Sequence, residues 1–163
     1  MDKAALIQKL GLELHPKEGG YFKRTYQSDL SIDTPEGSRY LLTSIFYLLT
    51  DDQPTGFLHK NRSDIIHYYQ LGAPTEYVVV NSVGELSRHI LGPDLEKGHV
   101  LQLTVKGGDW KGSKLLGTGY SLISEAVSPG FDYGDNTLAL AEHVVQFPEA
   151  TQKALAGFIR AND

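Results

Sequence analysis

Short apolar runs alternate with glycine-containing polar turns along most of the chain. The runs are rich in Tyr, Val, Ile, Leu and Thr, which suit the pleated surface of a β-sheet. Turn signals recur about every 8–12 residues, a spacing typical of a β-sandwich or barrel and not of βαβ units. The pattern predicts strands at residues 21–27, 40–50, 55–59, 65–71, 76–81, 85–91, 100–105, 109–111 and 120–127.

One chain reversal is explicit in the sequence. An apolar run ending at Val80 is followed by the polar turn Asn81-Ser82-Val83-Gly84 and a second strand, which predicts a β-hairpin. Gly92-Pro93 then ends the second strand, because these residues do not continue a sheet ladder.

Helical spacing of apolar residues occurs only near the two ends. Ala4, Ile7 and Leu10 predict a helix that Gly11 ends. Pro148 begins a second run with an apolar face, and residues 137–145 are predicted as a further helix. We therefore expect one domain over residues 1–163, with an N-terminal helix at about 3–11, a β-barrel at about 20–135 and a C-terminal helical segment at about 137–161.

The composition excludes several classes of function. The chain has no Cys, which removes disulfide scaffolds, thiol nucleophiles and cysteine-based zinc sites. A formal charge of −5 argues against a nucleic-acid partner, which would require a basic face. The apolar runs are too short for a membrane helix of about 20 residues, and the start does not look like a signal peptide. We expect a cytoplasmic protein with a small-molecule ligand.

The densest group of polar and aromatic residues lies at 56–69 and contains His59, Asp64 and His67. Histidine has an unperturbed pKa near neutrality, so it can act as an acid, a base or a metal ligand. A nearby carboxylate orients the ring and raises its basicity. Either His59 and Asp64 form such a catalytic pair, or residues 60–64 are a solvated turn and His67 is an aromatic-sized strand residue.

Strand alternation separates Asp64 from His67. Asp64 and Ile66 fall on one face of the predicted strand, and Ile65 and His67 fall on the other. Without a β-bulge, the two functional side chains do not point into one cavity. The pattern therefore weakens a metal site made of His59, Asp64 and His67, and we predict neither a metal nor another cofactor.

Three further segments carry candidate chemistry. Trp110 and Lys111 follow a Gly-Gly pair and form either the wall and anion contact of a pocket or a partly buried hairpin tip. Tyr133 is either a proton donor or part of an ordinary turn. In the loop that leads to Tyr21, Glu18 either pairs with Arg24 or lines the mouth of a pocket.

These segments, in this order, resemble a family of small bacterial and fungal cupins of unassigned function. The matching stretches are His15-Pro16 with Glu18-Gly19-Gly20-Tyr21, residues 43–49, residues 57–69, residues 105–110 and residues 127–133. The resemblance implies an all-β double-stranded β-helix, or cupin jelly roll, with terminal helices and assembly as a homodimer. It also implies a fold similar to that of the sugar-nucleotide 3,5-epimerases and the germin-like seed proteins.

The chain departs from the pattern of metal-binding cupins. Asn61 stands where that pattern has its second His, Asp64 lies near the position of its Glu, and Lys111 falls where its last His would be. A catalytic metal site needs about three protein ligands, which this set does not supply.

Three hypotheses follow. In the first, the barrel binds a sugar or nucleotide derivative and has epimerase or isomerase chemistry, with His59 as base, Asp64 as its partner and Tyr133 as proton donor. Glu18, Tyr21, His67, Trp110 and Lys111 would then bind the ligand. In the second, the protein is a non-catalytic binding or structural module. In the third, it is a metal-dependent enzyme.

Overall fold

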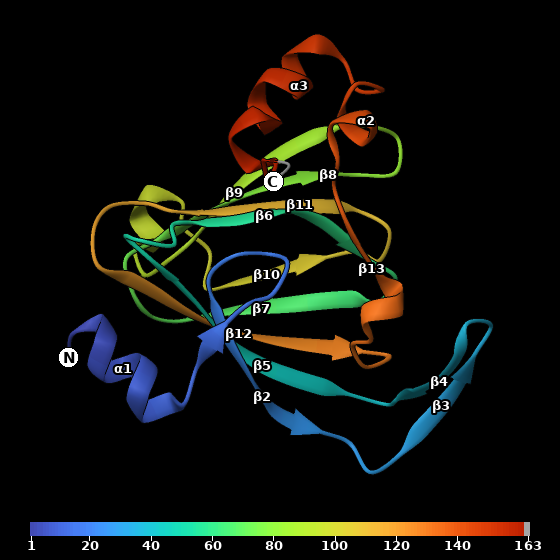
Figure 1. The fold of residues 1–163 in the computed structure, drawn as a ribbon. Helices are drawn as coiled ribbons and strands as arrows, with labels where there is room; N and C mark the ends of the chain where they lie inside the picture. The colour runs from blue at the N-terminus through green and yellow to red at the C-terminus, as the bar shows by residue number, and fades with distance from the viewer. Residues whose placement is uncertain (162–163) are drawn as a thin grey trace.

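Two antiparallel β-sheets face each other and form the body of the molecule (Figure 1). The structure is a computed structural model that describes residues 1–161. The six-stranded sheet consists, in spatial order, of β1 (Glu13–Leu14), β2 (Tyr21–Gln27), β5 (Thr43–Thr50), β12 (Tyr120–Ser128), β7 (Asp64–Gly72) and β10 (Gln102–Val105). The five-stranded sheet consists of β13 (Asn136–Leu138), β6 (Thr55–Asn61), β11 (Trp110–Leu115), β8 (Thr75–Val80) and β9 (Leu86–Leu91).

The chain crosses repeatedly from one sheet to the other, since β5, β6, β7 and β8 alternate between them. Strands that are neighbours in a sheet are therefore distant in sequence, as β12 shows by pairing with both β5 and β7. This is the topology of a jelly roll. The predicted all-β fold with helices at its ends is confirmed.

A separate hairpin of β3 (Ser31–Thr34) and β4 (Gly37–Tyr40) projects as an arm beyond the six-stranded sheet (Figure 1). The helical elements are α1 (Lys3–Leu10), α2 (Ala141–Val144) and α3 (Glu149–Leu155), with 3-10 turns η1 (Leu95–Lys97), η2 (Tyr133–Asp135) and η3 (Ala156–Phe158). None of the helices within residues 1–161 has the length and apolar character that crossing a membrane requires.

The local signals of the sequence explain most element boundaries. Asp2 caps α1 by accepting a hydrogen bond from Ala5 N at 2.8 Å, and Gly11 ends the helix in the left-handed conformation at φ 63°. The predicted hairpin is formed by β8 and β9. The predicted helix at 137–145 is wrong in its first part, because Asn136–Leu138 pairs with β6 as β13. Apolar spacing over so short a run does not distinguish a helix from an edge strand.

Helices cover the outer faces of both sheets. α3 and η3 lie over the five-stranded sheet, where Leu155 and Phe158 pack with Leu58, Val80 and Trp110. α1 packs against the six-stranded sheet through a second apolar cluster that contains Leu6 and Leu48. Inside the barrel, a third cluster around Tyr77, Leu103 and Ile123 fills part of the space between the sheets.

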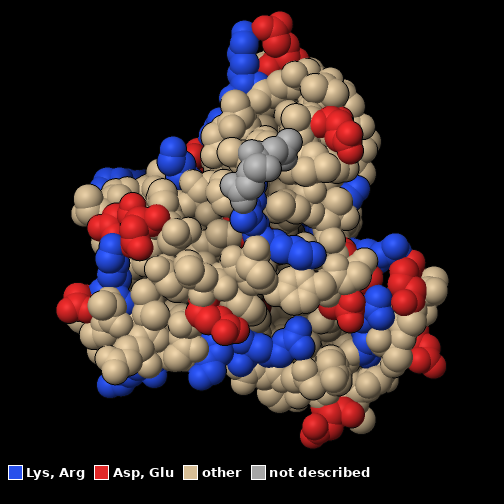
Figure 2. All heavy atoms as spheres, viewed as in Figure 1, with Lys and Arg blue, Asp and Glu red and all other residues tan. Residues whose placement is uncertain are grey.

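The surface charge is unevenly distributed. On the face shown in Figure 2, Lys and Arg side chains gather near the middle, and groups of both signs lie toward the edges. The net charge of −5 therefore does not describe every part of the surface.

Candidate functional site

A cavity of about 350 Å³ opens between the two sheets at the end of the barrel that carries β4 and η2. Its volume lies in the range of roughly 300–1,000 Å³ that is typical of small-molecule sites. The exposed residues Arg24, Tyr40, Asp132 and Tyr133 form its mouth. The buried lining residues, which form its deeper part, are Glu18, His59, Asn61, Ile65, Glu125 and Val127.

Strand alternation places the deep residues. On β6, His59 and Asn61 face the cavity, whereas Leu58 faces the outer core. The register sets His59 opposite Lys111 of β11 and His67 of β7 opposite Glu125 of β12. The two sheets therefore each bring one histidine and one charged side chain to the interior.

Glu18 reaches the interior from the loop between β1 and β2. Gly20 adopts φ 70°, and a Cβ at this position would lie 2.8 Å from the carbonyl oxygen of Leu48. The loop also joins β6, because Phe57 N donates to the carbonyl oxygen of Glu18 at 2.7 Å. The tight Gly-Gly turn thus holds the loop against the barrel with the Glu18 side chain inside.

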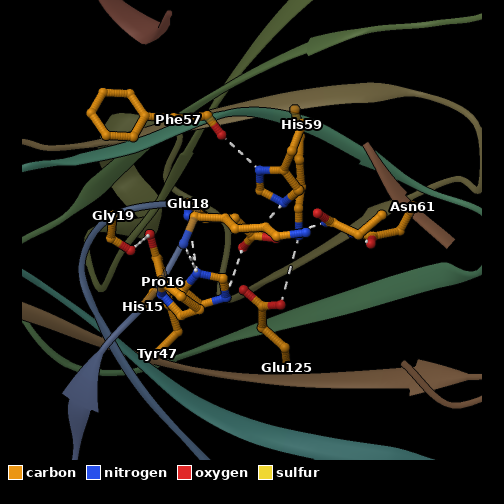
Figure 3. Close-up of polar contacts among 12 residues, drawn as sticks. His15, Pro16, Glu18, Gly19, Tyr47, Phe57, His59, Asn61 and Glu125 are labelled. Atoms are coloured by element: carbon orange, nitrogen blue, oxygen red, sulfur yellow. Dashed lines mark hydrogen bonds and ion pairs between the residues drawn. The ribbon is translucent and has the colours of Figure 1, made fainter. Parts of the chain in front are cut away.

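The carboxylate of Glu18 lies between two histidines (Figure 3). Its Oε2 is 3.5 Å from His59 Nε2 and 3.6 Å from His15 Nε2, and its Oε1 accepts a hydrogen bond from Asn136 Nδ2 at 2.8 Å. His15 Nδ1 accepts from the backbone N–H of Glu18 at 2.9 Å, so its ring proton is on Nε2, facing the carboxylate.

The opposite tautomer is assigned to His59. Its Nδ1 lies 2.6 Å from the carbonyl oxygen of Phe57, which can only accept, so Nδ1 carries the proton. In the neutral ring, Nε2 therefore presents a lone pair to Glu18. The 3.5 Å separation is longer than a direct hydrogen bond, and a small movement or one water molecule would connect the two groups.

Burial shifts the pKa values of His59 and Glu18 in opposite directions. Burial lowers the pKa of His59 to about 3, with the positive charge of Lys111 adding to the effect. Burial raises the pKa of Glu18, although His15 and Lys111 oppose the rise. His59 is therefore neutral near pH 7, and Glu18 is the member of the pair whose proton affinity is increased.

A second charged group lies beside the first. Lys111 Nζ donates to His67 Nε2 at 2.6 Å and lies 3.7 Å from Glu125 Oε2. His67 Nδ1 donates to the carbonyl oxygen of Leu103 at 3.2 Å, and burial lowers the pKa of His67 to about 3. Burial opposes ionisation of Glu125, but Lys111 and the three nearby histidines together outweigh it and hold the pKa of Glu125 below its ordinary value.

Lys111 also bears on whether the site can hold a divalent metal. No group of three or more His, Asp or Glu side chains within residues 1–161 has an arrangement that could hold a metal ion. The ammonium of Lys111 engages His67 Nε2 and lies beside Glu125. These two side chains, which could otherwise act as metal ligands, are therefore occupied by a cation. The side chains present do not fit the metal of a metal-dependent cupin.

The structure brings together five of the residues predicted from the sequence. Glu18, His59 and Tyr133 line the main cavity. Lys111 borders a smaller void that shares Glu18, His59 and Glu125 with the main cavity, and His67 contacts Lys111.

Asp64 lies elsewhere, so its predicted role as partner of His59 is corrected. At the exposed start of β7, its carboxylate accepts from Lys106 Nζ at 2.9 Å and from Gly107 N at 2.8 Å. The backbone N–H of Gly107 and then Lys106 lower the pKa of Asp64. The reason is strand alternation, which turns Asp64 away from the face that carries Ile65 and His67.

Trp110 and Tyr21 also lie outside the cavity. The Trp110 ring faces the helices that cover the outer side of the five-stranded sheet, with its centroid 5.3 Å from that of His143. Tyr21 packs in the cluster beneath α1, and its hydroxyl lies 3.5 Å from Asp52 Oδ2. Neither is positioned to bind a ligand in the cavity.

Sequence reasoning did not single out Glu125, Asn136 or a role for His15. Glu125 had a detectable signal, because it is the one charged residue in the run that became β12 and shares a face with Ile123 and Val127. Asn136 had none, since its contact with Glu18 depends on β13 pairing with β6.

Comparisons with known proteins agree with the architecture. A family model described as Cupin superfamily (DUF985) matches residues 4–139. An uncharacterized protein of Saccharomyces cerevisiae is 38% identical over 154 residues, which cover 85% of this chain and 76% of that protein.

Two solved structures are similar over nearly the whole chain. A hypothetical protein from Leishmania major superposes with a TM-score of 0.90 at 29% identity and covers 99% of this chain and 100% of its own. A protein from Shewanella oneidensis has a TM-score of 0.90 at 28% identity and covers 99% of each chain. The family expected from the ordered motifs is confirmed, and this chain belongs to the Cupin superfamily (DUF985).

Proposed function

We propose that the cavity binds a small polar ligand, a sugar or nucleotide derivative, and moves protons to and from it as an epimerase or isomerase does. The observation that carries this proposal is the buried pair of Glu18 and His59, whose facing atoms are 3.5 Å apart at the cavity wall. A carboxyl group with a raised pKa beside a neutral imidazole is suited to exchange a proton near neutral pH.

The lining suits a sugar-like ligand. Ile45, Ile65 and Val127 supply apolar walls, and Asn61 adds an amide beside the acid–base pair. Such a cavity, mostly apolar with a few polar groups, orients a ligand through its polar groups and excludes water through its walls.

The proposed reaction is abstraction of a proton next to a carbonyl group. The Glu18–His59 pair takes the proton from carbon, the electrons of the broken C–H bond move to the carbonyl oxygen, and an enolate forms. The nearby charge of Lys111 favours this negative species. Tyr133, at the mouth, returns a proton to the same carbon, and burial raises the pKa of its hydroxyl so that it stays protonated. Return from the opposite side inverts the carbon.

The test combines calorimetry with proton exchange. Purified protein is titrated with a panel of sugar nucleotides, sugar phosphates and keto sugars, and incorporation of deuterium from D₂O is followed by NMR. We expect binding and exchange, with His59→Ala and Glu18→Gln each lowering the exchange rate roughly 100-fold or more, and the exposed variant Asp64→Asn leaving it unchanged.

Binding without exchange would contradict the catalytic part of the proposal and favour a binding module. Unchanged exchange in His59→Ala would contradict the role given to His59, and failure of the whole panel to bind would contradict the proposal entirely.

Assembly as a homodimer and a cytoplasmic location remain predictions. The arm and the segments beside it expose large apolar side chains, namely Tyr26, Leu30, Ile32, Tyr40 and Leu41, which a second copy would cover. Light scattering coupled to size-exclusion chromatography measures the mass in solution.

A further inference from the structure

Arg24 brings a positive charge to the cavity. Phe22 and Arg24 are alternate residues of β2 and both line the cavity wall, so the arginine side chain lies on the inner face of the sheet. Among the described lining residues, Arg24 is the single Lys or Arg. The cavity therefore has one cationic contact, and it lies at the exposed mouth.

Neutral groups hold Arg24 in place. Its Nη1 donates to Gln27 Oε1 at 2.9 Å and its Nη2 donates to the carbonyl oxygen of Phe131 at 3.2 Å. Arg24 takes part in none of the ion pairs found within residues 1–161. No carboxylate of the described residues lies within ion-pair distance of its guanidinium, and its remaining N–H groups are available to a ligand.

The charges of the cavity are separated along its depth. Glu18 and Glu125 lie in the buried part, where Lys111 is already engaged by Glu125, and Arg24 lies at the mouth, so the cation open to a phosphate or carboxylate group is at the mouth. Asp132 also faces the mouth, and its Oδ1 accepts a hydrogen bond from Gly134 N at 2.7 Å. A ligand with one charged end would therefore bind in one orientation.

A second cation lies near the same mouth. Lys17 Nζ is 5.2 Å from the centre of the Tyr133 ring, and Tyr133 lines the mouth together with Arg24. Two cationic side chains, Lys17 and Arg24, therefore lie near the mouth, together with the carboxylate of Asp132. Guanidinium groups bind carboxylate and phosphate oxygens in pairs, which gives both charge and geometric complementarity.

We infer that the ligand of this cavity is an anion whose phosphate or carboxylate group binds Arg24 at the mouth while its uncharged polar end reaches Glu18 and His59. This inference rests on the proposed function, because it names the class of ligand that occupies the same site. It adds Arg24 as the residue that determines specificity for that class.

Matched neutral and anionic probes test the inference. Dissociation constants are measured by calorimetry at low ionic strength for uridine against uridine 5′-monophosphate, and for glucose against glucose 6-phosphate and glucuronate. We expect at least one anionic probe to bind about tenfold or more tightly than its neutral counterpart, and the phosphate and carboxylate members show which anion is preferred.

Two arginine variants locate the effect. Arg24→Gln should remove the preference for the anionic probe and leave binding of the neutral probe unchanged. Arg88 lies on β9 outside the cavity, so Arg88→Gln should retain the preference for the anionic probe. Equal binding of neutral and anionic probes, or a preference that survives Arg24→Gln, would overturn the inference but not the proposed function. Failure of every probe and of the wider sugar panel would overturn both.

Discussion

Glu18 and Asp64 are both candidate partners of His59, and the fold treats them in opposite ways. Asp64 follows His59 closely in the sequence, yet it lies at the exposed start of β7, hydrogen-bonded to Lys106 and Gly107. Glu18 is far from His59 in the sequence, yet it is buried with its Oε2 3.5 Å from the imidazole. Closeness in sequence is therefore a poor guide where strand alternation decides which face a side chain occupies.

The same contrast extends to two lysines. Lys106 pairs with Asp64 at the surface, with 71% of its side chain exposed, whereas Lys111 contacts Glu125 and His67 with 5% exposed. Solvent screens the attraction between Lys106 and Asp64, so this pair contributes little to the stability of the fold. Lys111 and Glu125 have lost their hydration on burial, so each charge depends on the other to offset the cost of removing it from water.

The largest predicted effect compares these lysines. Lys111→Met leaves Glu125 buried without its cation and should lower the free energy of unfolding by about 3–5 kcal/mol. Lys106→Met should lower it by less than about 1 kcal/mol. Denaturant unfolding of both variants measures the difference. Adding Glu125→Leu to Lys111→Met should restore part of the lost stability, and equal losses in the two single variants would contradict the comparison.

A smaller effect concerns the dependence of stability on pH. The pKa of His67 falls from 6.5 to about 3 on folding, so between these values the unfolded chain holds a proton that the folded chain excludes. The stability contributed by neutral His67 is fully present above pH 6.5 and is lost as pH falls toward 3, by about 1.4 kcal/mol per pH unit. His59 contributes to the pH dependence of stability in the same direction as His67. Glu18 contributes in the opposite direction, because its pKa is raised on folding.

Unfolding free energies of wild type and His67→Gln, measured between pH 7 and pH 4, separate these contributions. The variant should show a slope shallower by about 1.4 kcal/mol per pH unit over the lower part of this range. Parallel curves would mean that His67 titrates alike in the folded and unfolded chains.

The sequence supports a reliable prediction of the fold because its signals are local. β2 occupies the predicted residues 21–27, and α1 begins at its Asp2 cap and ends at Gly11. The arm was not predicted as a hairpin, because residues 31–40 are largely polar and lack apolar alternation. β13 was predicted as helix because its pairing with β6 depends on the rest of the barrel.

The site was only partly predictable, for a related reason. Glu18 was identified through its place in a loop that the family shares, and His59 through its chemistry. Trp110 was misplaced because the apolar layer that covers it comes from α3 and η3, far along the chain. Arg24 was named only as a possible pair for Glu18, whereas the structure turns it to the mouth of the cavity with neutral partners.

The most direct test of the account is an NMR titration of Glu18 and His59 in the wild-type protein, using the side-chain carboxyl carbon of the first and the ring nitrogens of the second. We expect Glu18 to titrate above its ordinary pKa while His59 stays neutral, with its proton on Nδ1, from pH 8 down to pH 5. A Glu18 that titrates at its ordinary value together with a His59 that gains a proton near pH 6.5 would contradict it.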